Sequence, residues 1–146
     1  MPRLLMQEAT PEVHRGFMDI AKLIHRGPLA RPTQELIKIR ASQLNGCAFC
    51  VDRHTQDFRA LGEPEERVHH LTVWRESPLY TDAERAALAY TEAATRREPV
   101  TDDVWETLRK HYPDDREVGD LVALVSLINA LNLFGVPLQL RPPARN

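Results

Sequence analysis

Residues 115–134 read DREVGDLVALVSLINALNLF, and this stretch decides the fold class. After its first turn, apolar side chains occur on almost every face of a helix, so other protein surfaces should cover it on most sides. Asp120 and Asn129 interrupt the apolar run and Pro137 soon follows it, which leaves less than the ~20 clean apolar residues of a membrane span. The segment therefore predicts a buried helix of a folded domain.

The rest of the chain shows the same helical period between Pro and Gly breaks, and no stretch alternates apolar and polar residues long enough for a strand. Further helices are expected after Pro11, after Pro32-Thr33, at or beside Cys47, from about Pro64, after Thr81 and after Thr101. The sequence thus predicts an all-α, single-domain helical bundle of about six to seven helices over residues 1–146.

Local signals mark several of these helix ends. Thr81-Asp82-Ala83-Glu84 has the Ser/Thr-x-x-Glu form of a capping box. Asn45-Gly46 ends the preceding helix, because glycine readily takes the left-handed conformation of a helix terminus. Trp74 and Trp105 are expected in the core.

Bulk properties exclude some classes of partner. The 146 residues, 42% of them hydrophobic, suffice for one domain with its own core. The formal net charge of -2 lacks the basic excess that binding to nucleic acid or to an anionic membrane requires. The N-terminus has no apolar segment typical of a signal peptide, so we expect a cytoplasmic protein.

The last helix also predicts self-association. A domain of this size can hardly enclose a helix that is apolar nearly all round. Part of that helix, and the segment Val136 to Leu140, should therefore pack against another copy of the chain.

Cys47-Ala48-Phe49-Cys50 holds the chain's 2 cysteines, and His54 follows one helical turn later. Residues three or four apart share a helix face, so Cys47, Cys50 and His54 can meet. Unpaired amide groups in the first helical turn favour a Cys50 thiolate, and His54 can accept or relay its proton. A thiolate that attacks a peroxide oxygen becomes a sulfenic acid, which a second thiol converts into a disulfide. The pattern predicts a redox-active dithiol that needs no cofactor.

Glu35 lies among the apolar positions of the helix that is expected after Pro32-Thr33. An ionised carboxylate is costly at such a position unless it has a partner. Glu35 is a candidate to orient or protonate His54, although the pattern also fits a solvated residue. Two other interpretations stay open. The two thiolates, the imidazole and the carboxylate would suffice for tetrahedral zinc. Alternatively, the dithiol senses oxidation and changes oligomer contacts without catalysis.

Glu35, Cys47-Ala48-Phe49-Cys50 and His54 together resemble the Glu, Cys-x-x-Cys, x-x-x-His signature of alkylhydroperoxidase D-like proteins of the carboxymuconolactone decarboxylase family. The flanking stretches 40–46, 77–88 and 127–132 also look familial. The resemblance implies an all-helical fold that assembles as a homotrimer or homohexamer. It also implies reduction of organic or hydrogen peroxides at the expense of an external dithiol reductant protein.

The resemblance also assigns roles to the four residues. Cys50 would attack the peroxide, and Cys47 would resolve the intermediate and exchange with the reductant. His54 with Glu35 would form the proton relay. One position departs from the pattern, because Phe49 stands where the founding hydroperoxidase has a histidine that assists proton transfer.

Overall fold

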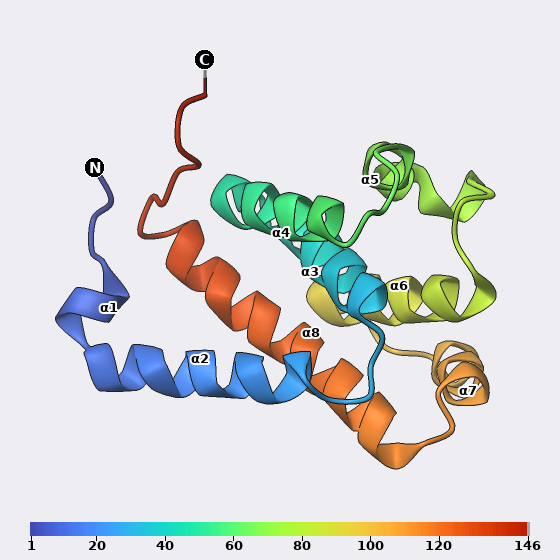
Figure 1. Ribbon diagram of the computed structural model, residues 1–146. Helices are drawn as coiled ribbons and strands as arrows, with labels where there is room; N and C mark the ends of the chain where they lie inside the picture. Colours follow the sequence, from blue (N-terminus) through green and yellow to red (C-terminus); the bar gives the residue numbers. More distant parts are fainter. Residues whose placement is uncertain (146) are drawn as a thin grey trace.

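The computed structural model describes residues 1–145, and these are helical and contain no strand (Figure 1). Its elements are α1 (Met6–Ala9), α2 (Pro11–His25), α3 (Arg31–Asn45), α4 (Ala48–Ala60), α5 (Glu66–His69), the 3-10 helix η1 (His70–Glu76), α6 (Asp82–Thr95), α7 (Asp102–His111) and α8 (Asp115–Gly135). The all-α prediction is confirmed. The expected count was slightly low, because the one-turn helix α1 was not foreseen and a kink at Val73 lies within η1.

Local signals set most of the helix bounds as expected. Thr81 accepts from the backbone of Glu84 while the Glu84 side chain accepts from the backbone of Thr81, which completes the capping box of α6. Gly46 ends α3 with φ 72°, in the left-handed region. Helix α3 begins at Arg31 rather than after Pro32, because proline suits the first helical turn, where its missing N–H costs nothing.

Helix α3 lies at the centre of the fold and packs against α4, α6 and α8 (Figure 1). Helix α8 is apolar and long enough to cross a membrane by length and composition alone, but here it contacts α2, α3, α4 and α6. Its buried side chains join those of α2, α3 and α6 in one core cluster, and a second cluster forms around Phe58 and Trp74.

Two exposure patterns bear on the sequence predictions. Trp105 is 39% exposed, so its assignment to the core was wrong. It lies on the outer helix α7 and contacts Tyr90 with one face only. Leu133 and Val136, near the end of α8, are 62% and 41% exposed within this chain. Their packing against a second copy stays a prediction.

A buried ion pair joins α3 to α6. Glu92 Oε2 accepts from Arg40 Nη2 at 3.0 Å, and Glu92 Oε1 accepts from the Trp74 indole at 3.2 Å. Both charged side chains are almost completely buried. Removing one partner would leave the other charge uncompensated in the interior, which is far more costly than loss of a surface pair.

Replacing Glu92 by Gln should therefore lower the free energy of unfolding by about 3 kcal/mol. Urea denaturation of the variant beside wild type measures the change. The exposed Glu98→Gln substitution is the matched control and should stay within about 0.5 kcal/mol of wild type. Equal stability of the two variants would contradict a structural role for the Arg40–Glu92 pair.

Candidate active site

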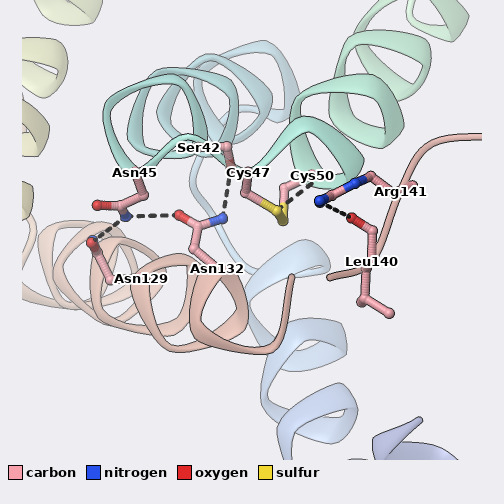
Figure 2. The surroundings of a disulfide bond; sticks show 8 residues. All are labelled: Ser42, Asn45, Cys47, Cys50, Asn129, Asn132, Leu140 and Arg141. Carbon is pink, nitrogen blue, oxygen red and sulfur yellow. Dashed lines mark hydrogen bonds between the residues drawn. A yellow bond between two sulfur atoms is a disulfide. The ribbon is translucent and has the colours of Figure 1, made fainter. Parts of the chain in front are cut away.

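The two cysteines lie where α3 gives way to α4 and are joined in a disulfide, with Cα atoms 5.3 Å apart. Cys47 is the N-cap residue of α4, and its Sγ lies 3.3 Å from the Cys50 backbone nitrogen, which donates to it (Figure 2). The Cys47 sulfur therefore caps the N-terminus of α4. In the reduced protein, the unpaired amide groups of the first helical turn favour negative charge on the two cysteine sulfurs.

The disulfide bears directly on the zinc interpretation. Two sulfur atoms bonded to each other are not thiolates, so in this oxidation state they cannot serve as the zinc ligands considered above. The chemistry that the arrangement supports is thiol–disulfide exchange.

Glu35 and His54 form the second half of the site. Glu35 is only 4% exposed, and its Oε2 lies 3.2 Å from His54 Nδ1. These two atoms form no hydrogen bond with each other, so the contact is an ion pair when His54 is protonated. The structure thus brings together two residues that come from α3 and α4, and the interpretation of Glu35 as a solvated residue is wrong.

Two further charged residues complete this group and were not foreseen. Lys38 Nζ lies 2.9 Å from Glu35 Oε1, and Asp57 Oδ2 lies 3.5 Å from His54 Nδ1. Burial raises the pKa of Glu35, but its contacts with His54 and Lys38 outweigh burial and hold that pKa below its usual value. Glu35 is therefore ionised near neutral pH, and it holds His54 Nδ1 so that Nε2 stays free to exchange a proton.

A cavity of about 1250 Å³ connects these groups. Glu35, Phe49, Cys50 and His54 line it, whereas Cys47 does not. Other lining residues come from α2, from α8 and from both terminal segments of the chain. Cys50 is therefore the sulfur that faces the space a substrate can occupy, which agrees with its predicted role.

The last turn of α8 covers Cys47 Sγ. A Cβ atom at Gly135 would lie 2.3 Å from Cys47 Sγ and 3.2 Å from Cys50 Sγ, so only glycine fits here without displacement. No sequence pattern indicates this contact, because Gly135 lies far from the cysteines along the chain and its backbone is ordinary helix.

Asparagine side chains hold α8 against α3 beside the disulfide (Figure 2). Asn132 donates to Ser42 Oγ at 3.0 Å, and Asn45 donates to Asn132 at 2.9 Å and to Asn129 at 2.8 Å. Figure 2 also places Arg141, from the C-terminal segment, beside the disulfide, and this residue lines the same cavity as Cys50. A guanidinium there favours a thiolate.

Comparisons with known proteins identify the family of this chain. The model of the carboxymuconolactone decarboxylase family matches residues 11–93. YdfG of Bacillus subtilis (strain 168), itself uncharacterized, is 38% identical over 145 residues, covering 98% of each chain. YnjA of Escherichia coli (strain K12), also uncharacterized, is 34% identical over 104 residues, which is 71% of this chain and 57% of that protein.

Solved structures share the fold. A protein of unknown function from Agrobacterium tumefaciens, whose description suggests the antioxidant defence protein AhpD, superposes with a TM-score of 0.94 at 35% identity and covers 99% of this chain and 100% of its own. The debrominase Bmp8 superposes with a TM-score of 0.85 over 94% of this chain and 75% of its own. At 18% identity, that likeness concerns the fold alone.

Replacing Gly135 by Ala should lower the free energy of unfolding of the oxidised protein by about 1–3 kcal/mol, because the new methyl group overlaps Cys47 Sγ. Urea denaturation measures the change. Gly119→Ala in the same helix is the matched control, since nothing lies within 4 Å of its Cβ position, and it should be stabilising by up to about 1 kcal/mol. Two equally stable variants would contradict the contact between α8 and the disulfide.

The lowered pKa of Glu35 makes a pH-dependent contribution to stability. A carboxylate whose pKa is lower in the folded state stabilises the protein fully above its unfolded value of 4.5, and this contribution is lost as the pH falls through the folded value. The stability advantage of wild type over Glu35→Gln should therefore shrink as the pH falls below 4.5. Urea midpoints at several pH values test this, and a pH-independent difference would contradict it.

Proposed function

The chain belongs to the carboxymuconolactone decarboxylase family, and from that premise we propose that it is a dithiol peroxidase that cycles between the Cys47–Cys50 dithiol and its disulfide. The observation that carries the proposal is the disulfide itself, one sulfur of which lines a large cavity together with the Glu35–His54 pair. Antioxidant defence is the role that such an activity would serve.

The first chemical step takes place at Cys50. Its thiolate attacks the terminal oxygen of the peroxide, the O–O bond breaks, and the leaving alkoxide takes a proton to become an alcohol. His54 supplies that proton through Nε2, because Nδ1 faces the carboxylates of Glu35 and Asp57. Cys50 is left as a sulfenic acid.

The second step takes place between the two cysteines. The Cys47 thiolate attacks Cys50 Sγ, the S–O bond breaks, and hydroxide leaves as water after protonation. The disulfide that results is then reduced by an external dithiol through two exchange reactions. The balance is one peroxide and two thiols converted into an alcohol, a water and a disulfide.

Phe49 modifies this proposal at one point. Its side chain is 37% exposed and lines the cavity, where it offers no proton. On α4, proton transfer to or from the substrate therefore rests on His54. We expect slower turnover than in a relative with histidine at this position.

The proposal also includes the setting of the reaction. A cytoplasmic location would keep the dithiol reduced between turnovers. Assembly into a homotrimer or homohexamer would cover the exposed apolar residues of α2 and α8, which are Val13, Ile20, Leu23, Leu133 and Val136. A sensor without catalysis is the competing proposal, and turnover separates the two.

Peroxide consumption with a small dithiol reductant should fall at least about 100-fold in Cys50→Ser, because the attacking thiolate is gone. Cys47→Ser should still react once and then stop as a sulfenic acid, which dimedone traps and mass spectrometry detects. Wild-type turnover that Cys50→Ser leaves unchanged would contradict the proposal. Negligible wild-type turnover with an oxidation-dependent change in assembly would favour the sensor.

A further inference from the structure

The cavity is much larger than the smallest peroxide requires. Pockets that hold drug-sized ligands measure about 300–1,000 Å³, and this one measures about 1250 Å³. Hydrogen peroxide would leave nearly all of that space to water. The size of the cavity indicates an organic substrate with a substantial apolar part.

One side of helix α8 forms an apolar floor for the cavity. The floor residues are Leu124, Leu127, Ile128, Leu131 and Phe134. From Leu124 to Phe134 the helix rises about 15 Å, and Phe134 directly precedes Gly135, which touches the disulfide. The floor therefore extends away from the reacting sulfur over a distance comparable with the chain of a medium to long fatty acid.

The far end of this floor carries unpaired positive charge. Lys22 and Arg31 line the cavity there, and neither forms an ion pair within residues 1–145. The end of α2 lies beside the first half of α8, since a Cβ atom at Gly27 would overlap the Asp120 side chain. The first turn of α3 lies there too, because Gln34 Nε2 donates to the Ile24 carbonyl at 3.2 Å. The two cations thus lie at the opposite end of the floor from Cys50.

The acidic residues of the cavity do not balance these cations. The Glu35 carboxylate contacts Lys38 and His54, and Asp57 Oδ2 lies 3.4 Å from Arg53 Nε. The whole chain carries a formal net charge of -2, but among the residues that line the cavity Lys22 and Arg31 are left without an acidic partner. An anionic group of a ligand would be attracted to them. Arg141 lies at the dithiol end, where the peroxide itself must bind.

We propose that the substrate is an amphipathic organic hydroperoxide that carries a carboxylate, of the fatty-acid hydroperoxide class. The carboxylate binds Lys22 and Arg31, the chain lies along the α8 floor, and the hydroperoxide reaches Cys50. This inference rests on the proposed peroxidase function. The reaction yields the hydroxy acid and water, the Cys47–Cys50 dithiol supplies both electrons, and the carboxylate is unchanged.

A hydroperoxide of linoleic acid and its methyl ester form a matched substrate pair, which differs only in the charge of the head group. The kcat/KM of the acid should be at least about tenfold higher, with the difference mainly in KM, because a charged hydrogen bond typically contributes about 1.5–3 kcal/mol. The preference should weaken as ionic strength rises. Equal kcat/KM values for acid and ester would overturn the inference while leaving the peroxidase function intact.

The double variant Lys22→Gln/Arg31→Gln should lose most of the preference for the acid over the ester. Arg116→Gln is the matched control, because Arg116 is an exposed arginine of α8 outside the cavity, and it should keep the preference. A preference that survives in the double variant would place the carboxylate elsewhere and overturn the assignment.

Binding without reaction separates this inference from the peroxidase function. Calorimetric titration of the oxidised protein with decanoate should show binding that 1-decanol lacks and that the double variant loses. If decanoate binds in this way but no peroxide is turned over, the proposed function fails and the ligand class stands. If neither compound binds because a second copy of the chain fills the cavity, the ligand class is overturned.

Discussion

The burial of α8 is the constraint on which the rest of the structure depends. A helix that is apolar on nearly every face needs other surfaces to cover it, and α2, α3, α4 and α6 pack against much of it here. Its last turn then covers Cys47, its asparagines hold the end of α3 from which α4 begins, and one of its sides forms the cavity floor. The same packing therefore stabilises the fold and positions the dithiol.

Electrostatics at the site follow from the way α3 meets α4. Glu35 is buried as an anion because the Lys38 ammonium and the His54 imidazole both reach it, and these contacts offset the desolvation of the carboxylate. The ionised carboxylate in turn fixes the orientation of His54. The His54 imidazole lines the same cavity as Cys50, which lies in the first turn of α4, where a thiolate is favoured.

Local chemistry made much of the fold predictable. The capping box at Thr81, the left-handed Gly46 and the helical spacing of Cys47, Cys50 and His54 depend on neighbours only a few residues away. Residues that act through distant neighbours were missed. Gly135 matters because of a sulfur far along the chain, and Arg141 lines the same cavity as Cys50 although the two residues are far apart in the sequence. Trp105 was misplaced because aromatic character alone does not tell which face of a helix is covered.

The proposed cycle between the Cys47–Cys50 dithiol and its disulfide is tested most directly by a single-turnover thiol count. Fully reduced protein receives one equivalent of an organic hydroperoxide without added reductant, and free thiols and intact mass are then measured. We expect that both thiols are lost together, that the chain becomes two hydrogens lighter, and that one equivalent of alcohol appears. Retention of both thiols, or oxidation that joins two chains in place of Cys47 and Cys50, would contradict it.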